Sequence, residues 1–357
     1  MENRRYFVDF ILREWLLFAS FAGLLTTSIY LKRVPPYSKD EFEVLFILAV
    51  LFVIVKGLET SGFLAWISGR LQKGRLLSLK LVMATFLLSM VVTNDVSLVV
   101  IVPITLLMDI PQKGILVILE ALAANAGSAL TPFGNPQNLF IYWHYQVAPW
   151  EFVKEIAPLS LLFLVLLAVA VLCFVKMEEE SNAQTAGTVA VEKGAFLYGA
   201  FLVVMVLAVL HLISIWIGVA VLAYTLLFDR RSLKIDYLLL LTFVCFFGLA
   251  ENFKVLLSSN INHPQNIFLF SALVSQVISN VPAALLFANF TVKWKALLWG
   301  TNVGGFGSLV GSLANLIAYK LYVSNGEGGD MGDFTLMFLV FGYVSFFIGV
   351  GLYLLLY

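Results

Sequence analysis

The chain has 357 residues, of which 61% are hydrophobic and only 12% are charged, and its mean hydropathy is +0.95. These values exclude an ordinary soluble domain, because so few polar residues cannot cover the surface of a soluble core of this size. The formal net charge is zero, so neither a basic nor an acidic excess indicates nucleic acid as a partner. The composition therefore predicts an all-α integral membrane protein with several spans, and we expect it in the cell inner (plasma) membrane.

Most of the apolar runs have about the length of one membrane span, which is about 20 residues for a hydrocarbon core roughly 30 Å thick. In chain order, these runs cover 15–31, 42–57, 156–175, 195–211, 212–228, 235–250 and 334–357. The continuous apolar stretch 195–228 contains no charge and is too long for one span. We therefore expect two helices there, with a turn near His211.

Two other runs fit neither one span nor two. The run 77–108 would be roughly 48 Å long as a single helix, whereas each half alone would be too short to cross. It is interrupted at Thr93-Asn94-Asp95, and the run 266–290 is interrupted at Ser279-Asn280-Val281-Pro282. A hairpin that enters the membrane and returns to the same side fits both runs. We predict such re-entrant hairpins over 77–109 and 266–290.

A segment rich in glycine and asparagine occurs twice, 177 residues apart, and each copy interrupts an apolar run. Without a gap, Asn125, Gly127, Gly134 and Asn138 align with Asn302, Gly304, Gly311 and Asn315. Pro132 and Pro136 cannot continue a helix in the first copy, and several glycines take their place in the second. Unwound backbone is tolerated at membrane depth only where protein or an aqueous cavity satisfies its polar groups. We therefore predict broken helices over 113–148 and 295–320, and about nine full spans plus two hairpins.

These pairs of interrupted elements divide the chain into a first repeat over 1–176, a linker over 177–193 and a second repeat over 194–357. Lysine and arginine are more frequent in segments on the side of the N-terminus, so we expect the N-terminus and the linker to be cytoplasmic. The first hairpin then enters from the cytoplasm and the second from outside, which makes the repeats inverted. Such halves are typical of a secondary transporter with its binding site at the midplane.

The chain resembles the ion transporter superfamily over roughly residues 40–350. The segments that carry the resemblance are TNDVSLVVIVP, SALTPFGNPQNL, SQVISNVPAALL and GGFGSLVGSLANL, in that order. They look like bacterial and archaeal anion permeases with a citrate transporter-like domain, which are grouped with divalent anion–sodium symporters and arsenite permeases. The resemblance implies a homodimer that works by an elevator-type alternating-access mechanism. It also implies that the hairpin tips and unwound helices bind substrate and cation.

The resemblance assigns site residues by motif position. The implied substrate-binding residues are Thr93, Asn94, Asn135, Asn138, Ser279, Asn280, Gly311, Ser312 and Asn315. The implied Na+ ligands are Asn94, Asp95, Gly134 and Asn280. In chemical terms, neutral oxygens and freed carbonyls suit Na+, and free amides at a helix N-terminus suit an anion. The alternative role of the asparagines is structural: hydrogen bonds to the tip backbone for Asn94 and Asn280, and between helices for Asn138 and Asn315.

Asp95 and Glu120 are the candidates for coupling to an ion gradient. The related symporters carry Ser-Asn-Thr at both tips, whereas the first tip here is Thr-Asn-Asp, which is closer to arsenite permeases and sodium–proton antiporters. A carboxylate at membrane depth indicates function by default, and capping of the hairpin is the alternative role of Asp95. Glu120 lies about two turns into a predicted span, where an interfacial or paired carboxylate is the alternative.

The sequence therefore predicts a secondary active transporter of a small anion or oxyanion, either a dicarboxylate or an inorganic anion, coupled to Na+ or H+. An arsenite or antimonite efflux permease and an Na+/H+ antiporter remain open as alternatives. An enzyme is not expected, because no histidine or cysteine lies beside any break. No cofactor is expected, with Na+ as the candidate coupling ion. The expected partners are the anion, Na+ or H+, the lipid bilayer and a second copy of the chain.

Overall fold

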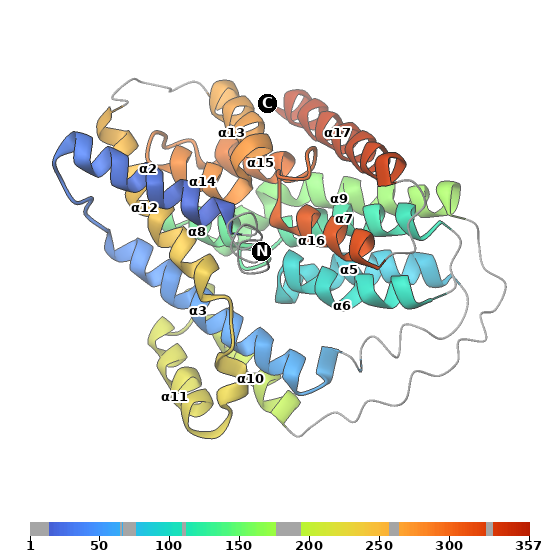
Figure 1. Ribbon diagram of the computed structural model, residues 1–357, viewed down its shortest axis with the longest axis horizontal. Coiled ribbons are helices and arrows are strands. Elements are labelled where there is room, and N and C mark those ends of the chain that lie inside the picture. The colour runs from blue at the N-terminus through green and yellow to red at the C-terminus, as the bar shows by residue number, and fades with distance from the viewer. Residues whose placement is uncertain are drawn as a thin grey trace, which may run out of the picture.

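The computed structural model describes residues 14–64, 66, 76–108, 112–175, 194–256, 264–325 and 331–357 (Figure 1). All regular elements among these residues are α-helices or short 3-10 helices, and the described part of the chain contains no strand. The predicted all-α class is therefore confirmed. The predicted linker over 177–193 lies outside the described residues.

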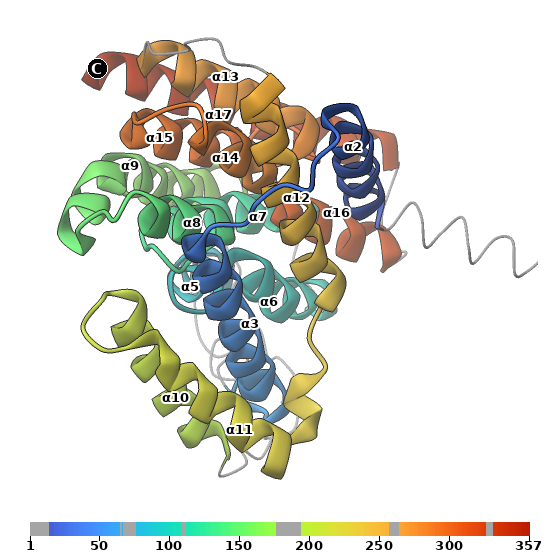
Figure 2. The same ribbon diagram turned by 90° about the vertical axis from the view of Figure 1, so that its left-hand side faces the viewer.

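The interrupted elements and the two long helices that pack on them form one group, and the remaining described elements form a second. The hairpin group contains the interrupted elements and the long helices α9 and α17, which pack on them: α5 (Leu77–Val92), α6 (Asn94–Leu107), α7 (Lys113–Ala129), α8 (Pro136–His144), α9 (Pro149–Phe174), α13 (Pro264–Ile278), α14 (Asn280–Ala288), α15 (Trp294–Gly304), α16 (Leu313–Ser324) and α17 (Met331–Leu356). The flanking group contains α2 (Trp15–Leu31), α3 (Lys39–Thr60), α10 (Gly194–Val209), η1 (Ile215–Ile217), α11 (Gly218–Phe228), η2 (Arg230–Leu233) and α12 (Tyr237–Leu256). In Figure 2, α3, α10 and α11 extend below the hairpin group, whereas α2 and α12 lie at its side.

The predicted interruptions fall between helices. Thr93 separates α5 from α6 and has a φ of 105°, and Ser279 separates α13 from α14 with a φ of 75°. Positive φ values are uncommon for residues other than glycine, so the two tips share an unusual backbone conformation. His211, with a φ of 61°, follows α10 at the predicted turn in the run 195–228.

Three stretches among the described residues are long and apolar enough to cross a membrane, namely Pro149–Phe174, Arg230–Leu256 and Met331–Leu356. Other apolar helices, including both arms of the first hairpin, have 10–17 residues. The expectation of about nine full spans and the re-entrant path of the hairpins stay predictions.

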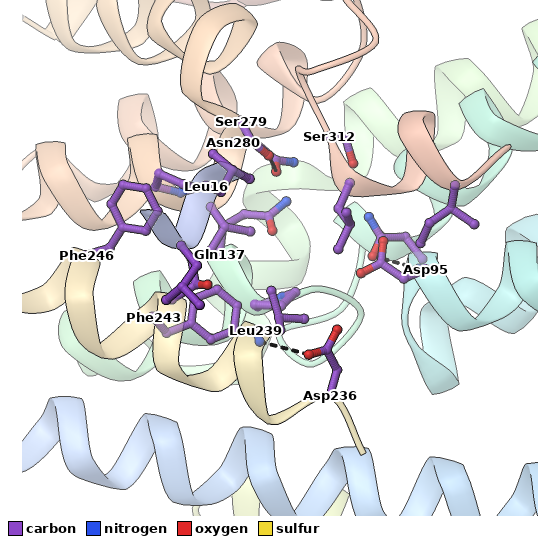
Figure 3. Close-up of a pocket in the computed structure, with 18 of the residues that line it drawn as sticks. Leu16, Asp95, Gln137, Asp236, Leu239, Phe243, Phe246, Ser279, Asn280 and Ser312 are labelled. Carbon is purple, nitrogen blue, oxygen red and sulfur yellow. Dashed lines mark hydrogen bonds between the residues drawn. The ribbon is translucent and has the colours of Figure 1, made fainter. Parts of the chain in front are cut away.

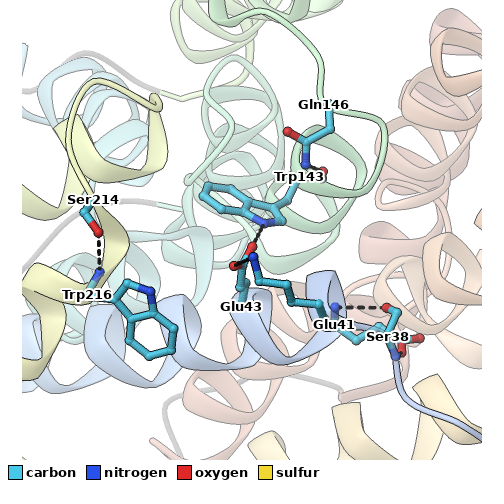
Figure 4. Close-up of polar contacts among 8 residues, drawn as sticks. Ser38, Glu41, Glu43, Trp143, Gln146, Ser214 and Trp216 are labelled. Atoms are coloured by element: carbon cyan, nitrogen blue, oxygen red, sulfur yellow. Dashed lines mark hydrogen bonds and ion pairs between the residues drawn. The ribbon is translucent and has the colours of Figure 1, made fainter.

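The two groups meet chiefly where α3 contacts α8 and where α12 contacts α14. Between α3 and α8, the indole Nε1 of Trp143 donates a hydrogen bond of 3.0 Å to the carboxylate of Glu43 (Figure 4). The first turn of α3 is held by a capping box, in which Ser38 and Glu41 exchange hydrogen bonds. The contacts between the two groups are fewer than those inside the hairpin group, where α5 runs along α7 and α13 runs along α15.

Candidate functional site

Each hairpin tip is tied to the unwound part of the broken helix in its own half. The backbone amide of Asn94 donates to the carbonyl oxygen of Gly134 at 3.1 Å, and that of Asn280 donates to Gly311 at 2.9 Å. Gly134 and Gly311 are matched positions in the two aligned segments. The same backbone contact therefore occurs once in each half, and it places the first residues of α6 and α14 beside the breaks.

Four matched asparagines cross-link the two broken helices. Asn125 donates from its side-chain amide to Asn315 Oδ1 at 2.8 Å, and Asn302 donates to Asn138 Oδ1, also at 2.8 Å. The amide groups of Asn138 and Asn315 also donate to carbonyls of their own unwound segments. All four side chains are 5% exposed or less. The buried polar backbone at the breaks is therefore satisfied by protein groups from both halves.

The second part of each broken helix begins with a side-chain cap. Asn135 accepts a hydrogen bond from the backbone amide of Asn138 at 3.0 Å at the start of α8. Ser312 accepts one from the amide of Ala314 at 3.2 Å at the start of α16. These are matched positions as well, and both residue types are favoured at helix N-caps.

The N-termini of α6, α8, α14 and α16 all border one cavity of about 340 Å³ (Figure 3). Asn94 and Asp95 line it from the first tip, and Ser279, Asn280 and Val281 line it from the second. Pro136, Gln137, Ser312 and Leu313 come from the starts of the two later half-helices. In Figure 3, Ser279, Asn280 and Ser312 lie above the opening, Asp95 lies at the right and Asp236 lies below. Both halves of the chain thus contribute to the lining of one cavity.

The charged side chains in the lining are those of Glu14, Asp95, Asp236 and Lys320, which give an excess of two negative charges if all are ionised. Each helix N-terminus acts as about +0.5 of an elementary charge, so four of them contribute about +2. The cavity is therefore close to electrically neutral. An anion alone would leave it negative, whereas an anion together with a cation would not.

Two buried acceptor oxygens in the lining have no hydrogen-bond partner among the described residues: Oδ1 of Asp95 and the side-chain oxygen of Gln137. Gln137 is only 1% exposed. A buried acceptor without a partner costs about 1–3 kcal/mol, so both oxygens favour a ligand that supplies a cation or a donor. The part of the chain that is described contains no group of three or more His, Cys, Asp or Glu side chains that could hold a metal ion.

The cavity brings together five of the residues assigned from the sequence: Asn94, Asp95, Ser279, Asn280 and Ser312. The other assigned residues do not line the cavity. They form the turns and hydrogen bonds of the backbone next to it: Thr93, Gly134, Asn135, Asn138, Gly311 and Asn315. Glu120 is fully buried away from the cavity and accepts a hydrogen bond from Thr105, and its Oε2 has no partner.

Sequence analysis missed the lining residues Gln137, Asp236 and Lys320. Gln137 lies inside the quoted motif, as the second residue of α8, and its place at a half-helix N-terminus was a usable signal. Asp236 and Lys320 had no such signal, because only the packing of α12 and α16 brings them to the cavity.

The chain is similar in sequence to several known proteins. The chain matches the family model described as "Citrate transporter" over residues 10–299. It is 34% identical over 324 residues to the "Uncharacterized transporter MJ0456" of Methanocaldococcus jannaschii, with 88% of this chain and 90% of the relative covered. It is 35% identical over 296 residues to the "Inner membrane protein YbiR" of Escherichia coli, with 77% and 78% covered.

A more distant relative is the "Silicon efflux transporter LSI3" of rice, Oryza sativa, with 25% identity over 354 residues and 71% and 72% of the two chains covered. The first two relatives and the family match each cover more than two thirds of this chain. The chain therefore belongs to the citrate transporter family, and it is a multi-pass membrane transporter rather than an enzyme.

Proposed function

We propose that this protein is a secondary active transporter that moves a small anion or oxyanion together with Na+ or H+. The observation that carries the proposal is the convergence of four helix N-termini, two from each half, on one cavity. The first amides of a helix have no intrahelical partner and carry the positive end of the helix dipole. A dicarboxylate or an inorganic anion supplies the acceptor oxygens and the negative charge that such a site favours.

The electrostatics of the cavity support coupling to a cation. Glu14, Asp95 and Asp236 offset the charge of the helix termini and Lys320. Transfer of the anion with Na+ or H+ keeps the occupied cavity near neutrality, and an unpaired charge at membrane depth is costly. Asp95 is the proposed coupling carboxylate, because it lies at a tip and one of its oxygens has no partner.

The division into two helix groups supports an elevator-type movement. In this proposal the hairpin group moves past the flanking group and carries the site with it, and the limited α3–α8 and α12–α14 contacts rearrange. The hydrogen bond between Glu43 and Trp143 would then break and reform in each cycle. The proposal includes a homodimer and a cytoplasmic N-terminus.

The proposal is tested with the purified full chain. Thermal shifts are measured with citrate, succinate, sulfate, phosphate, arsenite and silicic acid, each with NaCl or with choline chloride at equal ionic strength. A true ligand present at 100 times its Kd stabilises the fold by about 2.7 kcal/mol. Uptake of the hit is then measured in proteoliposomes with an imposed Na+ or H+ gradient. Accumulation is expected, whereas absence of uptake for every stabilising compound would contradict the proposal.

Two alternative functions each have a specific observation in their favour. The rice relative is named a silicon efflux transporter, which favours export as the first alternative. In that case this protein would export an oxyacid, such as arsenite or antimonite. The unpaired Asp95 oxygen favours an Na+/H+ antiporter, in which this carboxylate binds Na+ and protons in turn. Proteoliposomes that contain none of the candidate substrate anions separate the second alternative, because only an antiporter would acidify or alkalinise the lumen in response to an Na+ gradient alone.

A further inference from the structure

The flanking group packs against the site on one side and leaves it open on the other. On the closed side, α3 contacts α8, and Trp143 donates its hydrogen bond of 3.0 Å to Glu43. On the open side, the cavity of about 340 Å³ lies between α12 and α16. Its lining there includes Leu239 and Phe243 from α12, and Ile317 and Lys320 from α16. The two later half-helices thus differ in their contact with the flanking group: α8 is packed against it, whereas the cavity separates α16 from α12.

Trp143 and Lys320 occupy matched positions in the two halves. The helix α8 begins at Pro136 and α16 begins at Leu313, which are matched residues of the aligned segments. Trp143 is the eighth residue of α8, and Lys320 is the eighth residue of α16. The position that contacts α3 in the first half therefore carries a positive charge in the second half, where it lines the cavity.

Each half also has an acid at or just before the start of its long flanking helix. Glu43 is the fifth residue of α3, and Asp236 directly precedes α12, where it accepts a hydrogen bond of 3.0 Å from the amide of Leu239. In Figure 3, Asp236 lies below the cavity, and Ser312, which caps the start of α16, lies above it. Lys320 lines the same cavity and forms no ion pair with any residue that the structure describes. Opposite charges on the α12 side and the α16 side thus border the open side without being paired.

We propose that Asp236 and Lys320 form an ion pair that closes this side of the site when the hairpin group has moved to the opposite-facing state. The inference rests on the proposed elevator-type transport and adds the contact that closes the side that is open here. In a transporter built from inverted repeats, matched parts of the two halves form the two access routes, so the route that is closed in one state is open in the other. As α8 leaves α3, α16 approaches α12, and the ion pair takes the place of the hydrogen bond between Glu43 and Trp143.

Asp236 is the partner of Lys320 because it belongs to the flanking group, past which Lys320 moves. Asp95 lies on α6, which contacts α16 inside the hairpin group, so the movement does not bring Asp95 closer to Lys320. Glu14, which directly precedes α2, is the other carboxylate that the flanking group contributes to the lining. It therefore provides a matched control.

Cross-linking tests whether the two positions meet. Asp236→Cys and Lys320→Cys are combined in the full chain in nanodiscs, with Cys173 and Cys245 replaced by serine. A short bifunctional thiosulfonate is expected to link the two cysteines, and mass spectrometry measures the rate. Addition of Glu43→Leu is expected to raise that rate about ten-fold, because the lost hydrogen bond to a charged group stabilises the state in which α8 contacts α3.

Alkylation of a cysteine in the cavity tests whether the charges contribute. Ile317→Cys lies in the lining, and its rate of reaction with a water-soluble maleimide reports how often the cavity is open. In the Glu43→Leu background, Asp236→Asn keeps the helix cap and Lys320→Met keeps the side-chain length. Each is expected to raise the rate by about 1.5- to 5-fold, the range for ion pairs in contact with water. Their combination is expected to add nothing further, because both remove the same contact, and Glu14→Gln is expected to have no effect.

Tyr237→Cys with Lys320→Cys is the cross-linking control, because Tyr237 is adjacent to Asp236 but is not part of the cavity lining. Equal linkage in this control, no linkage of the Asp236 and Lys320 positions, or an unchanged alkylation rate in both charge variants would each overturn the proposal. A loss of anion affinity in Lys320→Met with an unchanged alkylation rate would also overturn it, because Lys320 would then be a ligand of the anion. Neither measurement requires transport. The transport function fails separately, if a protein that cross-links as expected transports no anion.

Discussion

The first and second halves of the site are built by the same contacts but end in different chemistry. In both halves, a tip amide binds a glycine carbonyl and an asparagine side chain ties the unwound segment to the other half. The first half adds Asp95 and Gln137 to the cavity, where the second has Val281 and Ala314. The matched groups are mostly satisfied within the protein, whereas the unmatched acceptors are not. The residues that repeat in both halves therefore build the frame, and coupling is proposed for a residue, Asp95, that has no acidic counterpart in the second half.

Replacement of the tip asparagines is expected to have the largest effect. Asn94→Ala and Asn280→Ala each remove a polar group that lines the cavity, so transport should fall by about 10- to 100-fold in either variant. Uptake in proteoliposomes measures this, and size-exclusion chromatography checks that the variant is folded and has the same oligomeric state as the wild type. Asn289→Ala, at the end of α14 and outside the lining, is the matched control. Full transport in one tip variant would show that this tip does not contribute to the site and that the two halves are not equivalent in function.

Glycine replacements test the packing of the frame. A Cβ at Gly127 would overlap the carbonyl oxygen of Phe86, and a Cβ at Gly304 would meet chiefly the side chain of Ser275. Both substitutions to alanine should lower the free energy of unfolding by about 1–3 kcal/mol, with the larger loss at Gly127 because a backbone group yields less readily. Thermal unfolding in detergent measures the loss. Gly199→Ala, with open space around its Cβ, serves as the control, and equal loss there would contradict the interpretation.

The crossed asparagine pairs should give the smallest effect. Double-mutant cycles to alanine for Asn125 with Asn315, and for Asn302 with Asn138, should yield coupling energies of about 0.6 kcal/mol, the average for side-chain hydrogen bonds between membrane helices, and no more than about 1.7 kcal/mol. The two cycles should agree, because both donor–acceptor distances are 2.8 Å. Clearly unequal coupling energies would show that the two asparagine pairs differ in energy although their distances are equal.

The helix breaks were predictable because polar residues interrupt apolar runs at Thr93, Ser279 and His211. The start of α9 was not predictable from the sequence. The predicted run begins at residue 156, whereas the helix begins at Pro149 and includes charged residues. One of them, Glu155, is satisfied by Lys295 at 3.0 Å and by Trp299 at 3.1 Å, partners that only the tertiary packing reveals.

The candidate site was predictable to the extent that its residues repeat. The aligned segments indicate which glycines and asparagines meet, since a repeated pattern implies repeated contacts. They do not distinguish a side chain that faces the cavity, such as Ser312, from one that stands behind it, such as Asn138. Nor does the repeat identify Gln137 as a lining residue, because the aligned residue in the second half is Ala314.

Asp95 is the proposed coupling carboxylate, in a site whose other tip has the neutral Val281 at the matched position. Transport by the Asp95→Asn variant in proteoliposomes tests this role most directly. Asparagine keeps the shape and much of the hydrogen-bonding capacity but carries no charge. Gradient-driven accumulation of the anion should be lost, while exchange of internal for external anion is retained. If accumulation and its dependence on Na+ and pH were the same as in the wild type, Asp95 would be only a hairpin cap, and Glu120 would become the candidate for coupling.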